Sequence, residues 1–364
     1  MFVYSKNYDN MKEDLQNELS ILKQYGYTIT TEKALIVADL AIDKITIKHQ
    51  EKASNRLIFT TGLHGIEGYV GHACLKTFFR DLLPSLKPNT EIVIYHGVNP
   101  FGMKNFRRTN ENNIDLNRNF TKNNFQNTNE GYDLLKAFFT PKRYRNKITA
   151  NLGYYTTLIS LVKQHGVAAL KDATLRGQKI LKEGLYYSGD TIQPSTAYIL
   201  SELNNNTFKE IDNVVWIDLH TGYGPRYQMS IVNSKYEKTS TKEMINQLDY
   251  PLILGMNVED FYEIDGDMLE KIYDIYHKQN ADCSLFATCF EFGTIGKSLL
   301  NTVSSLKAMV FENSAYFENQ TQNFNKYALK LIKEQFLPSA EKWRIKAEKD
   351  FLKAMQGIIT YKKL

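Results

Sequence analysis

The stretch Leu57-Ile58-Phe59-Thr60-Thr61-Gly62-Leu63-His64-Gly65-Ile66-Glu67-Gly68 is typical of a buried strand that turns directly into a helix. Open α/β sheets hold their ligands at the carboxyl ends of their strands. From such an edge the imidazole of His64 and the carboxylate of Glu67 can reach one cation, at the ~2.0–2.2 Å that zinc requires. Taken alone, such a pair more often caps a helix or makes a surface hydrogen bond.

The rest of the chain alternates the same two kinds of element. The spacing of apolar residues predicts strands within 34–49 and at 57–61, 92–95, 214–219, 229–232 and 285–290, and helices at 10–25, 67–82, 241–248, 266–278 and 323–355. The segment from Leu134 to Leu185 is predicted to be mostly helical, and a short helix to end near Leu203. Strand, helix and strand over 57–95 form a βαβ unit, which favours parallel neighbours. We expect one compact α/β unit.

Composition excludes several classes of protein. The 364 residues carry 45 basic and 40 acidic side chains, for a net charge of +5, and 43% of them are hydrophobic, as in a soluble globular protein. The longest basic run, 142–147, is short and isolated, which favours a solvated loop or helix face over a nucleic-acid site. With three cysteines we expect no disulfide framework, and Cys74 and Cys289 lie in apolar runs, as small core residues do.

The sequence also bears on location. The N-terminal residues lack the basic start and the apolar stretch of a signal peptide. No apolar run reaches the roughly 18 residues that a membrane span needs. We therefore expect a cytoplasmic protein that does not enter a membrane.

Two further strand ends supply residues that suit a metal site. His220 follows the apolar strand at 214–219, and Glu291 ends a later one. Because strand ends from distant parts of a chain gather at one edge of a sheet, these side chains can meet His64 and Glu67. Two imidazoles and a carboxylate form the open zinc site of hydrolytic enzymes, with water in the fourth position. Glu291, flanked by phenylalanines, then suits a general base, or alternatively an ion-pair partner for a nearby Lys or Arg.

A polar loop at 101–130 offers groups that bind a substrate. It contains Arg108, Asn117 and Arg118 within runs rich in Asn and Arg. An arginine can hold a substrate carboxylate through two hydrogen bonds, an asparagine can orient it, and a second arginine near the metal can stabilise an oxyanion. The alternative is a loop held together by structural ion pairs.

The order of these residues resembles the zinc metallocarboxypeptidase superfamily, which includes succinylglutamate desuccinylases and aspartoacylases. The pattern is carried by His64-x-x-Glu67, Arg108-x-Asn110, Asp115-Leu116-Asn117-Arg118-Asn119-Phe120, His220 and Glu291. Residues 65–69, 177–189, 218–225 and 291–294 further resemble a bacterial branch of unknown function within that superfamily. The resemblance covers roughly residues 5–350.

The resemblance implies a fold and a role for each residue. The fold is a single α/β domain over residues 1–364, a three-layer α/β/α sandwich around a mixed, mostly parallel central sheet. A helical insert at about 131–185 is absent from the digestive enzymes and is expected to reshape the pocket. By the resemblance, His64, Glu67 and His220 would bind one zinc ion, and Glu291 would be the catalytic carboxylate. Arg108 would polarise the carbonyl group of the substrate, and Asn117 and Arg118 would bind a substrate carboxylate.

One expected feature has no clear match. The digestive carboxypeptidases cover their substrate with a tyrosine, for which Tyr223, Tyr262 and Tyr273 are candidates here, none of them in a matching motif.

Other polar residues flank the predicted site. Asp218 shares a strand face with His220, so it either supports that ligand or caps an adjacent element. His96 ends a strand and is a candidate to line the pocket, whereas His72 is expected to pack or to cap. The two remaining helical histidines, His165 and His277, are expected to be incidental.

We therefore expect a zinc-dependent hydrolase that cleaves an amide or peptide bond next to a free carboxylate, as a metallocarboxypeptidase does. The substrate is either a small peptide or an N-acyl amino acid, the latter as for an aspartoacylase. A second hypothesis is a carboxylate-binding protein without catalysis. The sequence does not predict the oligomeric state.

Overall fold

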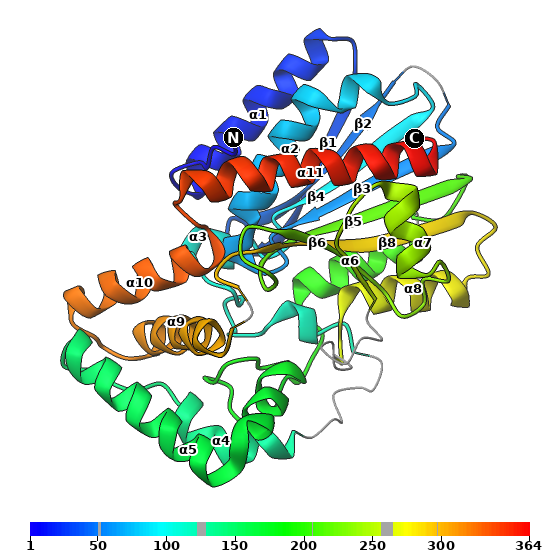
Figure 1. The fold of residues 1–364 in the computed structure, drawn as a ribbon. Coiled ribbons are helices and arrows are strands. Elements are labelled where there is room, and N and C mark those ends of the chain that lie inside the picture. The colour runs from blue at the N-terminus through cyan, green and yellow to red at the C-terminus, as the bar shows by residue number, and fades with distance from the viewer. Residues whose placement is uncertain (50–51, 122–128, 206, 256–264, 297) are drawn as a thin grey trace.

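The computed structural model describes residues 1–49, 52–121, 129–205, 207–255, 265–296 and 298–364, and within these ranges eight strands form one sheet (Figure 1). The strands are β1 (Thr28–Val37), β2 (Leu40–Lys48), β3 (Asn55–Thr61), β4 (Thr90–His96), β5 (Asn213–Gly222), β6 (Met229–Asn233), β7 (Ile253–Gly255) and β8 (Ser284–Gly293). They lie in the order β1-β2-β4-β3-β5-β8-β6-β7.

The sheet is mixed, with a parallel centre. Strands β4, β3, β5 and β8 run parallel to one another. Strand β2 pairs antiparallel with both β1 and β4, β6 pairs antiparallel with β8, and β7 runs parallel to β6. The predicted βαβ unit is confirmed, because β3 and β4 are parallel neighbours joined through a helix, α2 (Gly68–Asp81).

Helices cover both faces of the sheet. On one face α1 (Tyr8–Gln24), α2, α7 (Thr241–Leu248) and α11 (Glu341–Lys362) share a core with the sheet, and on the other α6 (Pro194–Asn205) and α8 (Met268–Lys278) do so. Figure 1 shows α1, α2 and α11 on the side of the sheet opposite α6 and α8. Because each layer buries an apolar face against its neighbour, the predicted three-layer α/β/α sandwich is confirmed.

A separate group of helices lies beyond the sheet. Helices α4 (Glu130–Phe139), α5 (Lys147–Leu175), α9 (Leu299–Phe317) and α10 (Gln322–Phe336) pack around a third apolar core (Figure 1). The hydroxyl of Thr221, near the end of β5, donates to the carbonyl oxygen of Phe336 at 2.7 Å, which joins this group to the sheet edge. The predicted helical insert therefore lies in a layer with two later helices.

Some predicted boundaries were wrong. The helical segment predicted from Leu134 to Leu185 ends at Leu175, and the backbone of Gly177 then takes a φ of +77°, which a helix does not allow. The helix predicted over 323–355 is divided into α10 and α11 around Pro338, which cannot continue a helix. Helix α9 and the three-residue strand β7 were not predicted.

Within the described ranges, no helix combines the length and the apolar character needed to cross a membrane.

Close packing of two glycines ties the end of β3 to the short helix α3 (Pro100–Asn105). A Cβ atom on Gly65 would lie 2.3 Å from the Cα of Gly102, far inside van der Waals contact. The turn that follows β3 therefore fits against α3 only without a side chain at position 65.

We predict that Gly65→Ala lowers the free energy of unfolding by about 1–3 kcal/mol, because the backbone of α3 must move to admit the methyl group. The matched control is Gly153→Ala on α5, where a Cβ meets no atom within 4 Å. That change should raise the free energy by about 0.5–1 kcal/mol, since Ala favours a helix over Gly. Urea unfolding measures both, and equal stability of the two variants would contradict the packing argument.

Candidate metal centre and active site

The turn after β3 carries two of the predicted ligands. His64 precedes a single 3-10 turn, Gly65–Glu67, which runs directly into α2. The amide of Gly65 donates to the carbonyl oxygen of Arg108 at 3.2 Å, and the amide of Ile66 donates to that of Arg107 at 2.8 Å. The backbone that positions the ligands is thus hydrogen-bonded to the loop that carries the predicted substrate-binding arginines.

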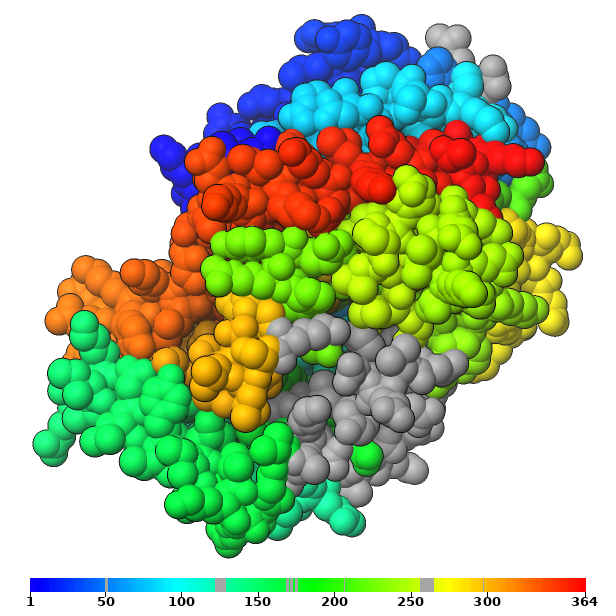
Figure 2. Space-filling view, viewed as in Figure 1, coloured from blue at the N-terminus to red at the C-terminus, as the bar shows by residue number. Residues whose placement is uncertain are grey.

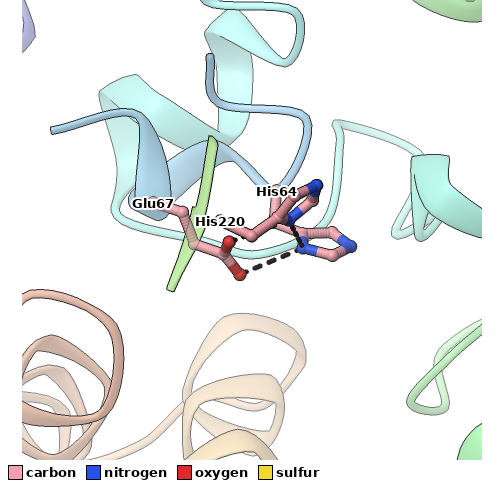
Figure 3. Close-up of side chains that lie close together, drawn as sticks. All are labelled: His64, Glu67 and His220. Atoms are coloured by element: carbon pink, nitrogen blue, oxygen red, sulfur yellow. Dashed lines mark hydrogen bonds and ion pairs between the residues drawn. The ribbon is translucent and has the colours of Figure 1, made fainter. Parts of the chain in front are cut away.

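Three predicted ligands meet at one point (Figure 3). One ligand atom from each of His64, Glu67 and His220 lies within 4.8 Å of the other two, and all three residues are buried. The two Nδ1 atoms are 3.2 Å apart, Oε1 of Glu67 lies 3.0 Å from Nδ1 of His64, and Oε2 lies 3.1 Å from Nδ1 of His220. A tetrahedron with arms of about 2.1 Å has edges of about 3.4 Å, so the donor set and its spacing fit a zinc ion.

Each imidazole is oriented by an aspartate on its far side. Nε2 of His220 donates to Oδ2 of Asp218 at 2.6 Å, and Nε2 of His64 lies 3.1 Å from Oδ1 of Asp115. Both histidines consequently direct Nδ1 toward Glu67, as metal-binding histidines with carboxylate partners do. Of the two roles open for Asp218, the structure shows the contact with His220 that support of the ligand requires, and its other carboxylate oxygen accepts a hydrogen bond from the hydroxyl of Thr60 at 2.6 Å.

The role of Asp115 was missed by sequence reasoning. Its position at the head of the segment Asp115-Leu116-Asn117-Arg118-Asn119-Phe120 was the available signal. Its carboxylate contacts a residue 51 positions earlier, which no local pattern indicates.

The electrostatics keep Glu67 ionised. Burial opposes its charge, but His64 and His220 beside it hold the pKa of Glu67 well below its usual range. Its Oε2 also accepts a hydrogen bond from the amide of Thr221 at 2.9 Å. Burial opposes the positive charge of His220, yet Asp218 and Glu67 raise the pKa of that imidazole. The centre therefore holds a fixed negative charge between two basic rings.

Glu291 lies beside the cluster on the neighbouring strand. In the parallel pairing of β5 with β8, Glu291 stands opposite His220. Its Oε1 accepts a hydrogen bond from the amide of Tyr223 at 2.9 Å. Burial and the nearby charge of Glu67 raise the pKa of Glu291 to about 8. A carboxyl group that titrates near neutral pH can both take up and release a proton.

Arg108 reaches the metal ligands directly. Its Nη1 donates to Oε1 of Glu67 at 3.3 Å, its Nε donates to Oδ2 of Asp115 at 3.1 Å, and its Nη2 lies 2.7 Å from Nε2 of His64. Burial opposes its charge, but Asp115 and Glu67 raise the pKa of the guanidinium. The neighbouring Arg107 instead donates from its Nε to Oε1 of Glu312 at 2.7 Å and stacks on the ring of Tyr316 on α9. For Arg107, the alternative reading of the polar loop as one held together by structural ion pairs therefore applies.

Arg118 and Asn117 lie on a short turn at the side of the site. Arg118 is buried, and burial together with the charge of Arg108 lowers the pKa of its guanidinium, although Asp115 opposes this. Such a position favours the arrival of a further anion. The amide of Asn117 donates to Asp267 at 2.9 Å and accepts from the amide of Met268 at 2.9 Å, so in this structure it secures the start of α8.

The three tyrosines that the sequence offered as a cover for the substrate lie in different surroundings. Tyr273 is buried against β8, where its hydroxyl accepts from the amide of Ala287 at 3.1 Å, and Tyr262 lies outside the described residues. Tyr223 is exposed next to Glu291. Sequence reasoning missed Tyr186.

Tyr186 belongs to the segment that follows the helical insert. Its backbone is left-handed, with a φ of +57°, a conformation that costs a tyrosine about 1–3 kcal/mol. Burial raises the pKa of its phenol, while the positive charges of Arg108 and Arg118 oppose this rise, which places the three groups in one environment. A strained residue beside charged groups is a frequent feature of functional sites.

The remaining histidines do not join the cluster. His72 and His96 are both buried, and Nδ1 of the former lies 3.3 Å from Nε2 of the latter, away from the three ligands. His72 packs as predicted, and His96 contacts it and lies with its Nδ1 3.8 Å from Oδ2 of Asp43. The assignment of Cys289 to the core needs correction, because it is partly exposed on the strand face that also carries Glu291, while Cys74 is fully buried.

Comparisons with known proteins place the chain in a family. Residues 4–350 match the family described as "protein of unknown function (DUF2817)", and the chain belongs to it. No curated protein matches the chain.

Solved structures give weaker likenesses. Bovine thrombin-activatable fibrinolysis inhibitor, in complex with a tick carboxypeptidase inhibitor, is 14% identical, with a TM-score of 0.48 over 90% of this chain and 98% of that one. Carboxypeptidase A from Helicoverpa armigera is 13% identical, with a TM-score of 0.47 over 92% of this chain and 74% of that one. A murein-tripeptide amidase from Escherichia coli O157 is 17% identical, with a TM-score of 0.37 over 79% of this chain and 90% of that one.

We predict that Asp218→Asn weakens zinc binding about 10–100-fold, because the ring of His220 loses the carboxylate that orients it. Competition with a chromogenic chelator measures the affinity. Asp190→Asn, at an exposed carboxylate, is the control and should bind zinc as the wild type does. Unchanged affinity in Asp218→Asn would show that Asp218 does not support the ligand.

Proposed function

We propose that this protein is a zinc-dependent hydrolase that cleaves an amide or peptide bond next to a free carboxylate, in the manner of a metallocarboxypeptidase. The observation that carries the proposal is the meeting of His64, Glu67 and His220 at one point with Glu291 on the adjacent strand. Three ligands leave the fourth tetrahedral position open, which is typical of catalytic rather than structural zinc sites.

The metal would be held by His64, Glu67 and His220, and one ion is proposed. When bound there, zinc supplies a Lewis acid that lowers the pKa of water toward ~7 and polarises a carbonyl group.

Glu291 is proposed as the general base and acid. Its raised pKa suits proton exchange near neutral pH, and Glu67 beside it stays ionised. Two neighbouring carboxyl groups with separated pKa values can take different roles, one as a fixed ligand and one as a proton carrier. Glu291 would take a proton from water and deliver it to the leaving nitrogen.

Two arginines are proposed to bind the substrate. Arg118 would hold the free carboxylate, with Asn117 beside it, because its buried guanidinium favours an added anion. Arg108, which contacts Glu67 and His64, would polarise the scissile carbonyl and stabilise the oxyanion.

The substrate class has two candidates, a small peptide and an N-acyl amino acid. Both place a carboxylate next to the amide that is cleaved, so both fit a base at Glu291 and an anion site at Arg118. Assays of the zinc-loaded protein against C-terminal peptides and N-acyl amino acids distinguish them. Activity on neither, with or without metal, would contradict the proposed hydrolase.

We predict that Glu291→Gln reduces kcat by about 100-fold or more, because the amide cannot accept a proton, while zinc content stays unchanged. The comparison is Glu341→Gln, at an exposed position on α11, which should retain full activity. If Glu291→Gln turns over substrate normally, the base lies elsewhere. A protein that only binds carboxylates would be indifferent to the change.

We also predict that Arg118→Gln raises KM about 10–100-fold for substrates with a free carboxylate, since a bidentate contact to that group is lost. Arg118→Lys keeps the charge and should give an intermediate increase. Amidated substrates serve as the control, because their KM should be the same in both variants and the wild type. Equal increases for free and amidated substrates would place Arg118 outside the carboxylate site.

A further inference from the structure

The chain that follows the helical insert is built onto the polar loop of the site. We call residues 177–193 the post-insert segment. The amide of Asp115 donates to the carbonyl oxygen of Tyr187 at 2.8 Å, and the side-chain amide of Asn119 donates to that of Ser188 at 2.8 Å. The post-insert segment is therefore anchored on both sides of the turn that carries the proposed carboxylate site.

The same anchoring reaches both arginines of the proposed site. Gly177 lies against Arg118, since a Cβ atom on this glycine would be 3.1 Å from the Cδ atom of the arginine. Asp115, whose amide is held by the post-insert segment, accepts a hydrogen bond from Nε of Arg108 at 3.1 Å. A side chain on this segment is thus placed beside two guanidinium groups.

Tyr186 brings a hydrogen-bond donor to that position. Its hydroxyl lies 3.7 Å from Sδ of Met309 on α9, and the start of this helix borders a hollow in the surface (Figure 2). Among the residues that the structure describes, this sulfur is the one hydrogen-bond partner of the phenol. Because a thioether is a weak acceptor, the hydroxyl proton is available to a stronger one, such as an anionic oxygen.

The hydroxyl of Tyr186 lies on the side of Arg108. Met309 stands one turn before Glu312 on α9, and Glu312 accepts a hydrogen bond from Nε of Arg107 at 2.7 Å. The phenol and the loop that carries Arg108 therefore contact the same stretch of the helix. Burial raises the pKa of the phenol, and the positive charge of Arg108 is the strongest influence that opposes this rise.

We propose that the hydroxyl of Tyr186 joins Arg108 in stabilising the oxyanion that forms when water attacks the scissile carbonyl group. Both donors would meet an oxygen that becomes fully charged only after the attack, so their hydrogen bonds strengthen in the transition state. The inference rests on the proposed function, because it assigns one more donor to the same reaction. It also gives the helical insert a task, which is to deliver this donor to the site.

The first test is Tyr186→Phe, which removes the hydroxyl and keeps the ring. We expect kcat to fall about 100-fold, as on removal of one donor from an oxyanion site, with KM within about twofold of the wild type. Thermal unfolding should not change, because the lost partner is a thioether. The matched control is Tyr187→Phe, whose hydroxyl donates to Asp190 at 2.8 Å and which should keep the wild-type kcat.

The second test measures binding by calorimetry in zinc-loaded Glu291→Gln protein. N-acetylglycine carries the planar carbonyl group of a substrate, and N-(methylphosphonyl)glycine carries a tetrahedral anionic oxygen in its place. Glycine has no side chain, so neither probe requires a particular side-chain pocket. Adding Tyr186→Phe should weaken binding of the phosphonyl compound about 100-fold and leave that of N-acetylglycine within about twofold.

The outcomes separate this role from the proposed function. An active enzyme in which Tyr186→Phe keeps the wild-type kcat overturns the role and leaves the hydrolase intact. A rise in KM confined to substrates with a free carboxylate assigns the phenol to the Arg118 site and also overturns it, as does a Glu291→Gln protein that does not prefer the phosphonyl compound. If the zinc-loaded wild type hydrolyses no substrate while Tyr186→Phe still weakens phosphonyl binding selectively, the hydrolase proposal fails and the contact of Tyr186 with a tetrahedral anion stands.

Discussion

The parallel pairing of three strands is the constraint on which the site depends. Backbone hydrogen bonds hold β3, β5 and β8 side by side, so that Thr61 stands opposite Leu219 and His220 stands opposite Glu291. Side chains alternate between the faces of a sheet, so a slip of one residue in either pair would send a functional group to the opposite face. The relative positions of the ligands and the proposed base are therefore fixed by main-chain geometry rather than by contacts among themselves.

The site that these strands position consists of buried charged groups that compensate one another. The carboxylate of Glu67 lies among two imidazoles and Arg108, and each imidazole has an aspartate behind it. Removing one partner from such a set leaves its neighbour buried and unpaired, which costs more free energy than the pair itself contributes. Arg107 shows the same principle in a structural role, since its contact with Glu312 secures the loop against α9.

The sequence predicted the sheet, its parallel centre and the gathering of His64, Glu67 and His220, because strand ends obey simple rules of topology. The predictions for Glu291, Arg108, Asn117 and Arg118 as functional residues stay predictions until they are tested. Contacts between segments far apart in the sequence could not be predicted, and the hydrogen-bonding distance between Asp115 and His64 is an example. The packing of α4 and α5 on α9 and α10 depends on tertiary contacts that no local periodicity carries. The left-handed backbone of Tyr186 likewise follows from its surroundings, since tyrosine itself disfavours that conformation.

The contact between Gly65 and Gly102 has a consequence for how sequences of this fold can vary. One glycine lies inside the ligand turn and the other 37 positions later on α3. A Cβ on Gly65 would meet the backbone of Gly102, whereas a Cβ on Gly102 would meet the side chain of Asn99 and the carbonyl oxygen of Arg107. Evolution can exchange Gly65 only if the ligand turn separates from α3, and separation would move the turn that carries His64 and Glu67. Gly102 is constrained separately, because a side chain there would displace Asn99 or the backbone of Arg107, which accepts a hydrogen bond from the ligand turn. In distant relatives whose other residues have diverged, two glycines at this separation offer a marker of an intact ligand turn.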